Sequence, residues 1–127
     1  MLKNASAFSG FSVDDVDAAT KFYGETLGVG VEDAGMGNIV LHLADGLDVF
    51  VYIKEDHVPA AFTILNFRVD NIDETIDQLA AKGVQTLRYD GMPQDDRGVM
   101  RGKEHDMGPN IAWFTDPAGN VLSVIEE

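Results

Sequence analysis

Three histidines and a tyrosine are the side chains of this sequence best suited to acid–base chemistry. His42 and Tyr52 alternate with apolar residues in two stretches typical of strands, and His105 lies in a glycine-rich segment. Because an imidazole exchanges its proton near neutral pH, His42 and His105 are candidate general bases, with Tyr52 as a weaker candidate. His57 lies in the polar stretch 55–60, which we expect to be a solvated linker. No Ser/His/Asp spacing and no phosphate-binding glycine loop accompanies them.

Metal and thiol chemistry have little support in the sequence. Cysteine is absent, which excludes disulfides, thiolate metal ligands and cysteine nucleophiles. His42, Glu104 and His105 are the one set of side chains that could bind a metal ion in an unusual arrangement. We nevertheless predict no metal site and no cofactor.

The charge balance limits the partners. The chain of 127 residues has 22 acidic and 9 basic side chains, for a net charge of −13. Such a surface repels phosphate groups, so nucleic acid and anionic membranes are poor partners. The acidity indicates either a well-solvated surface or a preference for cationic ligands. No apolar run reaches the length of a signal peptide core or a membrane span, and we expect a cytoplasmic protein.

The elements that would position these side chains are clearest near the C-terminus. Residues 111–115 and 121–125 are apolar and flank Asp116-Pro117-Ala118-Gly119-Asn120, a pattern typical of two strands joined by a tight turn. Because side chains alternate along a strand, this hairpin has two faces. We predict that Ala112, Phe114, Leu122 and Val124 pack under a helix. We predict that Ile111, Trp113, Val121, Ser123 and Ile125 line a cavity.

An internal repeat organises the rest of the chain. The segment 11–17 recurs as 67–73, each ending a strand and opening a helix. Asp15 is the predicted N-cap of the first helix, Asn71 forms a capping box with Glu74 in the second, and Gly28 ends the first. The repeat predicts an α+β fold of two βαβββ units, about 5–54 and 61–127, within a single domain 1–127. We expect one curved, eight-stranded mixed sheet with its helices outside and a trough inside.

This organisation resembles the vicinal oxygen chelate superfamily, which includes glyoxalase I, extradiol dioxygenases and the fosfomycin- and bleomycin-resistance proteins. The resemblance is carried by residues 13–19, 22–23, 67–72 and 113–120. It implies that the family's usual metal-ligand places fall at Phe8, Ile64 and Ser123. Phenylalanine and isoleucine carry no donor atom for a divalent cation, and serine is a poor ligand. The resemblance therefore predicts the fold and argues against metal-dependent catalysis.

The inward faces of the predicted strands are apolar and aromatic with a few polar groups, a composition typical of a ligand pocket, although a filled core is the alternative. The predicted ligand-binding residues are Phe8, Ser12, His42, Phe50, Tyr52, Asn66, Arg68, Trp113 and Ser123. Trp113 is expected either to stack on an aromatic or cationic ligand or to pack in the core. Because an unpaired buried charge is costly, Arg68 and Asp48 should either pair with neighbours of opposite charge or bind a ligand, and an arginine can hold a carboxylate through two hydrogen bonds.

The segment 91–109 is predicted to be irregular, and we interpret it as a lid over the trough or else a dimer contact. Together these features predict a metal-independent protein that binds a small aromatic or cationic molecule and forms a homodimer. The alternative is a glyoxalase-like lyase, isomerase or dioxygenase-type enzyme that uses a nonstandard metal site or a His/Tyr base.

Overall fold

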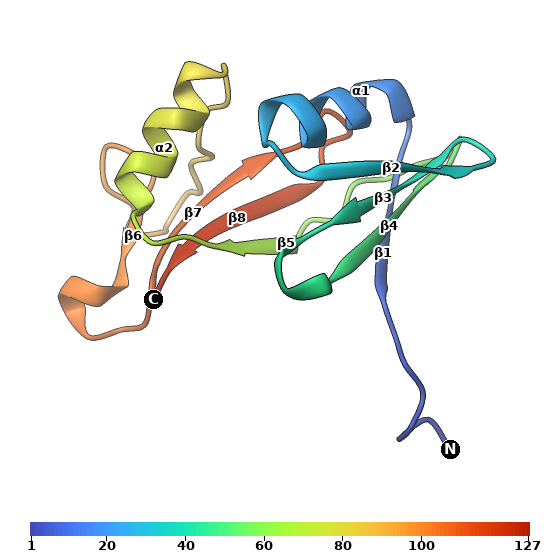
Figure 1. The fold of residues 1–127 in the computed structure, drawn as a ribbon. Coiled ribbons are helices and arrows are strands. Elements are labelled where there is room, and N and C mark those ends of the chain that lie inside the picture. The colour runs from blue at the N-terminus through green and yellow to red at the C-terminus, as the bar shows by residue number, and fades with distance from the viewer. The chain divides into compact units, whose positions relative to one another are not determined.

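A computed structural model describes all 127 residues, which form two compact units, residues 1–58 and 59–127. Each unit contains one four-stranded mixed sheet and one main helix (Figure 1). The eight strands and the α+β class are as predicted, and they are distributed over two separate hydrogen-bonded sheets. None of the helices is long and apolar enough to cross a membrane.

The first unit contains β1 (Ser9–Val13), α1 (Val16–Lys21), β2 (Gly30–Gly35), β3 (Asn38–His42) and β4 (Asp48–Ile53). The strand order is β1-β4-β3-β2, with β1 parallel to β4 and the other neighbours antiparallel. Alternation places one set of side chains against α1 and the turn that follows it. The buried set comprises Phe11, Val13, Ala19, Tyr23, Ile39, Leu41, Val49 and Val51.

The start of α1 is as predicted, but its end is not a regular helix. The Asp15 carboxylate accepts a hydrogen bond from the Ala18 N–H at 3.0 Å, as an N-cap should. From Phe22 to Thr26 the chain forms a π-helical turn, in which the Leu27 N–H donates to the Phe22 carbonyl. Gly28 follows with φ of 72°, the left-handed conformation in which a glycine ends a helix.

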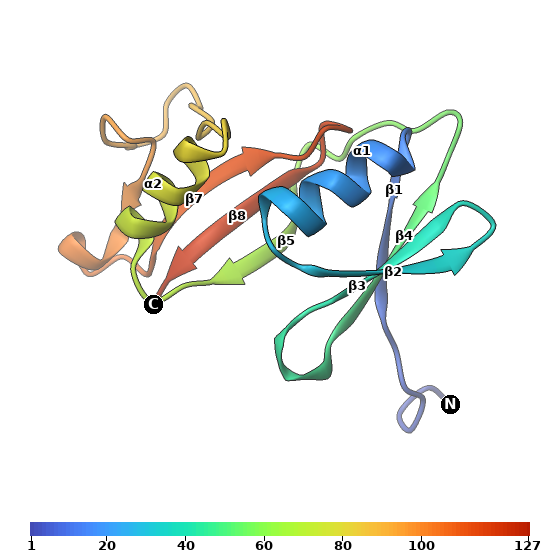
Figure 2. The same ribbon diagram turned by 45° about the horizontal axis from the view of Figure 1, so that its top comes forward.

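The second unit contains β5 (Thr63–Arg68), α2 (Ile72–Ala81), β6 (Met100–Arg101), β7 (Asn110–Thr115) and β8 (Val121–Glu126). Its strand order, β5-β8-β7-β6, repeats the order of the first unit, with β5 parallel to β8. Both views show α2 lying beside β7 and β8 (Figures 1 and 2). All four residues of the predicted helix-facing set, Ala112, Phe114, Leu122 and Val124, are buried, and so are Trp113, Val121 and Ser123 of the other face.

The turn between β7 and β8 is built as predicted. The buried carboxylate of Asp116 accepts hydrogen bonds from the backbone N–H groups of Ala118 and Asn120 and from the Asn120 side chain. Gly119 has φ of 85°, a conformation that an L side chain would strain. The turn fixes the register in which Trp113 pairs with Ser123.

Residues 84–90, where the βαβββ repeat implies a strand after the second helix, form none. The Leu87 N–H donates to the Trp113 carbonyl, so the segment begins to follow β7. The Thr86 hydroxyl then donates to the Arg97 carbonyl, and the Arg88 guanidinium donates to the carbonyls of Asp95 and Asp96. These bonds hold the segment to residues 95–97 instead of to a strand ladder.

Candidate functional site

The second unit has an open cavity of about 490 Å³ on the face of β5 and β8. Parallel pairing of these strands places Asn66 opposite Ser123 and Arg68 opposite Ile125, which brings four of the predicted inward positions together. The residues that line the cavity are Ile64, Leu65, Asn66, Arg68, Pro109, Ile125 and Glu127. The combination of an apolar floor with a few polar groups is typical of small-molecule sites.

Ser123 holds the side chain of Asn66 in one orientation. The Ser123 hydroxyl is fully buried and donates to Asn66 Oδ1 at 2.5 Å. Since Oδ1 is the acceptor end of the amide, the donor end, Nδ2, is left without a partner in the protein. The Asn66 side chain lines the cavity and is exposed, so it offers N–H groups there.

Arg68 and Glu127 form an ion pair at the edge of the same cavity. Arg68 Nε donates to Glu127 Oε1 at 2.7 Å, and this is the one hydrogen bond that the guanidinium makes. The Arg68 side chain is 84% exposed, so its two terminal nitrogens remain available. The prediction that Arg68 is paired is confirmed, although the charge is not buried.

The first unit presents an aromatic face on β1 and β4. Phe8 is exposed and meets Phe50 edge to face, with ring centroids 6.4 Å apart. The rings of Phe50 and Tyr52 are stacked at 6.2 Å. Nearby on β1, the Ser12 hydroxyl lies 2.6 Å from Nδ1 of His57. His57, which was expected to be solvated, therefore has a protein partner.

His42 bridges three adjacent strands of the first sheet. Its Nδ1 lies 2.7 Å from Asp48 Oδ1 on β4, and its Nε2 lies 2.7 Å from Glu32 Oε2 on β2. The hydrogen bonds to Asp48 and Glu32 raise the pKa of His42 above 6.5, because both carboxylates favour the imidazolium. Both ring nitrogens contact carboxylates, and a role of His42 as a general base stays a prediction. The prediction that Asp48 pairs with a basic side chain is confirmed by this contact with His42.

The remaining predicted site residues lie apart from the cavity. His105 ends an exposed 3₁₀ turn over Gly102–His105. Trp113 is 9% exposed, and the ring of Tyr89 covers it edge-on at a centroid distance of 5.5 Å. The tryptophan faces the predicted side of the sheet, but Tyr89 takes the place expected for a ligand. A ligand contact for Trp113 stays a prediction.

The places implied for a metal ion do not hold a suitable set of donors. Phe8 and Ile64 are hydrocarbons, and the Ser123 hydroxyl is already bonded to Asn66. No three histidine, aspartate or glutamate side chains are grouped so that they could hold a metal ion. Carboxylate and imidazole groups are the donors that divalent cations need in a cysteine-free protein. The residues present do not fit the family's metal.

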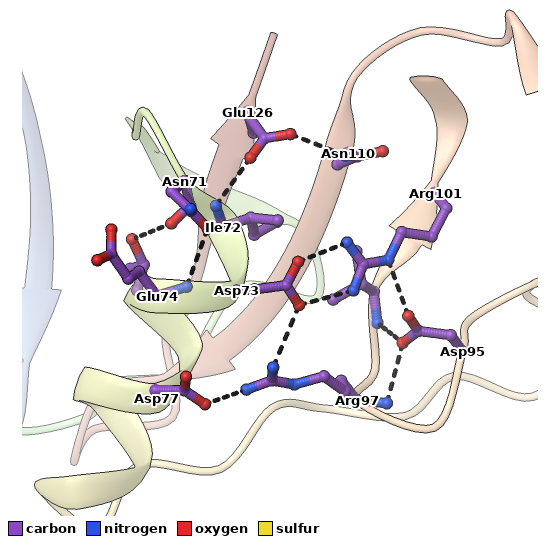
Figure 3. Close-up of polar contacts among 12 residues, drawn as sticks. Asn71, Ile72, Asp73, Glu74, Asp77, Asp95, Arg97, Arg101, Asn110 and Glu126 are labelled. Atoms are coloured by element: carbon purple, nitrogen blue, oxygen red, sulfur yellow. Dashed lines mark hydrogen bonds and ion pairs between the residues drawn. The ribbon is translucent and has the colours of Figure 1, made fainter. Parts of the chain in front are cut away.

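Part of the predicted lid is fixed to α2. Arg101 binds Asp73 of α2 with both terminal nitrogens, and its Nε donates to Asp95 (Figure 3). Arg97 pairs with Asp73 and Asp77, and Val99 is fully buried. These contacts hold residues 95–101 against α2, and none of these residues lines the cavity, while the role of the segment 91–109 as a lid or a dimer contact stays a prediction. Pro109, at the end of the segment, lines the cavity.

Three cavity residues, Leu65, Pro109 and Glu127, were not predicted from the sequence, and alternation alone would place Leu65 on the other face of β5. Glu127 follows the last strand, and its side chain carries no motif that would single it out. Pro109 is within the segment interpreted as a lid, and only the fold places it beside β8. Alternation along 121–125 continues to position 127, so Glu127 could have been placed on the face of Ser123 and Ile125.

Comparison with known proteins agrees with the topology. Residues 8–124 match the family model described as Glyoxalase/Bleomycin resistance protein/Dioxygenase superfamily. Comparison with curated proteins gives no match.

Solved structures of similar fold cover almost the whole chain. A glyoxalase family protein from Bacillus anthracis is 19% identical, with a TM-score of 0.68 over 100% of this chain and 99% of its own. The fosfomycin resistance protein FosX from Listeria monocytogenes is 14% identical, with a TM-score of 0.71 over 98% and 93%. TnmS3, an antibiotic binding protein from Streptomyces sp. CB03234, is 21% identical, with a TM-score of 0.65 over 97% of each chain.

Proposed function

The chain belongs to the Glyoxalase/Bleomycin resistance protein/Dioxygenase superfamily, and we propose that it binds a small molecule in the β5/β8 cavity without a metal ion. The observation that carries the proposal is that the implied metal-ligand positions in this unit hold Ile64 and Ser123, which contribute to a surface suited to an organic molecule. Ile64 offers hydrocarbon, and Ser123 orients the Asn66 amide toward the cavity. Apolar contact and a few hydrogen-bonding groups suit binding better than activation by a cation.

One solved structure of the same fold supports a binding role, since TnmS3 is described as an antibiotic binding protein. FosX, a fosfomycin resistance protein, is described in complex with Mn(II) and a phosphonic acid, and this neighbour favours the metal-dependent alternative. A small, partly apolar compound of natural-product size would fit a cavity of about 490 Å³. The aromatic face of Phe8, Phe50 and Tyr52, together with Ser12 and His42, supplies the further ligand contacts that we predict for the first unit.

The protein is further proposed to be a cytoplasmic homodimer. In this proposal each unit has an open sheet face that a second copy or a ligand would cover. Sedimentation velocity on the full chain measures the state directly. A monomer at all concentrations would contradict the dimer and leave the cavity proposal unaffected.

The proposed function is tested with chelator-treated protein. We expect at least one compound of a broad metabolite and antibiotic panel to raise the unfolding temperature equally with and without added Zn²⁺ or Mn²⁺. A ligand at about 100 times its Kd adds about 2.7 kcal/mol to the free energy of unfolding, which such an assay detects. Binding that appears only after metal is added would contradict the proposal and favour the enzyme alternative.

A matched pair of variants locates the site. Ile125→Trp places a large ring in the cavity and should abolish the shift. Ile53→Trp adds the same ring to a half-exposed position of β4 in the first unit and should leave the shift intact. If the two variants behave alike, the ligand does not bind in the β5/β8 cavity.

A further inference from the structure

We propose that the β5/β8 cavity selects organic oxyanions, with the anionic group on Asn66 and Arg68 and the apolar body on Ile64, Ile125 and Pro109. The inference rests on the proposed function, since it assigns a ligand class to the same cavity. The oxyanion is a carboxylate or a phosphonate, both of which supply oxygen acceptors for the unpaired N–H groups of Asn66 and Arg68.

The unused hydrogen-bonding groups of Asn66 are donors. Asn66 Oδ1 accepts from the buried Ser123 hydroxyl, and turning the amide over would take this acceptor away from the buried hydroxyl proton. Both hydrogens of Nδ2 therefore remain for a ligand. A ligand group that meets them must be an acceptor.

Arg68 supplies further donors to the same place. Of its five N–H groups, the one on Nε is bonded to Glu127, and those on the two terminal nitrogens have no protein partner. Asn66 and Arg68 stand two residues apart on one face of β5, about 7 Å along the strand. The long arginine side chain spans that distance, so both can reach one carboxylate or phosphonate.

The other lining residues favour an organic anion over an inorganic one. Ile64 and Ile125 are half-buried, and Pro109 completes an apolar surface beside the donors. Because covering apolar surface is favourable in proportion to the area removed from water, these residues favour a ligand with a hydrocarbon or aromatic body. An inorganic phosphate or sulfate would leave this surface exposed.

Glu127 acts as a competitor within the cavity. It is the one acidic residue among the cavity residues, and its carboxylate binds the guanidinium that an incoming anion would use. A ligand anion would therefore replace or share this partner. In the ligand-free protein Glu127 therefore weakens the preference of the cavity for anions. Removing Arg68 and removing Glu127 should have opposite effects on anion affinity.

The overall charge of −13 predicts a preference for cations, which is opposite to the inference for this cavity. Exposed charges more than a Debye length of about 8 Å away are largely screened at physiological ionic strength. The local groups, which are donors apart from the paired Glu127, then decide selectivity inside the cavity.

Calorimetric titration of the full chain with four phenyl compounds tests the inference. Phenylacetate and benzylphosphonate carry an oxyanion, phenylacetamide is neutral, and benzylamine is a cation. We expect the better of the two oxyanions to bind roughly tenfold more tightly than phenylacetamide, with benzylamine weakest. The ratio of the two anions identifies whether the carboxylate or the phosphonate is preferred. Equal or tighter binding of benzylamine would overturn the inference.

Two variants of the ion pair separate recognition from structure. Arg68→Gln should weaken binding of the preferred anion about tenfold and leave phenylacetamide unchanged, whereas Glu127→Gln should strengthen it about threefold. Lys82→Gln, which removes one exposed positive charge at the end of α2, is the control and should change affinity less than about twofold. A purely structural ion pair would make both variants weaken binding, and that result would overturn the inference.

The remaining outcomes separate this inference from the proposed function. If all four compounds bind with equal affinity and Ile125→Trp abolishes binding of each, the oxyanion inference is wrong and the cavity proposal stands. If neither these compounds nor any member of the wider panel binds, both are wrong.

Discussion

Arg101 binds Asp73 with both terminal nitrogens, Nη1 lying 2.9 Å from Oδ2 and Nη2 lying 2.8 Å from Oδ1 (Figure 3). This bidentate pair joins α2 to the segment that precedes β7. Arg101 also donates from Nε to Asp95, so a single guanidinium connects a helix to a loop that the sequence pattern leaves irregular. The segment 95–101 is therefore part of the folded structure of the second unit.

Replacing Asp73 with asparagine should destabilise the second unit by about 1–2 kcal/mol, because an amide cannot accept both hydrogen bonds from Arg101. Chemical denaturation followed by tryptophan fluorescence measures the loss. Arg68→Lys is the matched control, since its ion pair is exposed and formed through one bond, and it should change stability by less than about 0.5 kcal/mol. Equal effects of the two substitutions would contradict a structural role for the Asp73–Arg101 pair.

The same cluster predicts a loss of stability in acid. The hydrogen bond from Arg101 lowers the pKa of Asp73 below 3.8. Burial acts to raise the pKa of Asp95, but the Val99 N–H and Arg101 outweigh it and the pKa is lowered. Lowered carboxylate pKa values stabilise the folded state above about pH 4, and this contribution is lost as the pH falls through the folded-state values. Arg101→Met should flatten the fall in stability below pH 4, whereas an unchanged slope would refute the assignment.

His42 should titrate above its ordinary pKa of 6.5, because Asp48 and Glu32 stabilise the charged ring. Its contribution to stability is complete below pH 6.5 and disappears as the pH rises through the folded-state pKa. Asp48→Asn should lower this pKa, as followed by the ring proton resonances in an NMR titration. A His42 titration that is the same in the wild type and in Asp48→Asn would contradict the hydrogen bond.

Asp116→Ala should cost about 2–3 kcal/mol, since it leaves the N–H groups of Ala118 and Asn120 without their acceptor in a buried turn. Asp116→Asn keeps one acceptor oxygen and should cost less. Thermal unfolding of both variants gives the order. If alanine is tolerated as well as asparagine, the carboxylate does not organise the turn.

Much of the fold was predictable because local signals and the repeat agree. Asp15 and Asn71 accept the N-cap hydrogen bonds expected of them, and the Asp116 turn sets the β7/β8 register. At the start of α2 the Glu74 N–H donates to Asn71 Oδ1, as one half of the predicted capping box requires, but the Ile72 N–H donates to Glu126, a residue 54 positions away. A hydrogen bond to a residue so distant in the chain produces no local sequence pattern from which it could be predicted.

The site was only partly predictable for the same reason. Alternation placed Asn66, Arg68 and Ser123 on one face of the second sheet, but it could not show that the Ser123 hydroxyl donates its hydrogen bond to Asn66. It also could not show that Tyr89 covers Trp113, because residues 84–90 are held by loop contacts with residues 95–97 and not by a strand ladder. Contacts between side chains on irregular segments cannot be predicted from the periodicity of the sequence.

The central claim is that the β5/β8 cavity holds a ligand without a metal ion, and NMR on chelator-treated, isotope-labelled protein tests it most directly. With a compound that stabilises the protein, we predict shifts of the Asn66 side-chain amide and of the Ile64 and Ile125 methyl groups, unchanged by added Zn²⁺ or Mn²⁺. Shifts that spare these three residues, or that arise only when metal is present, would contradict the account.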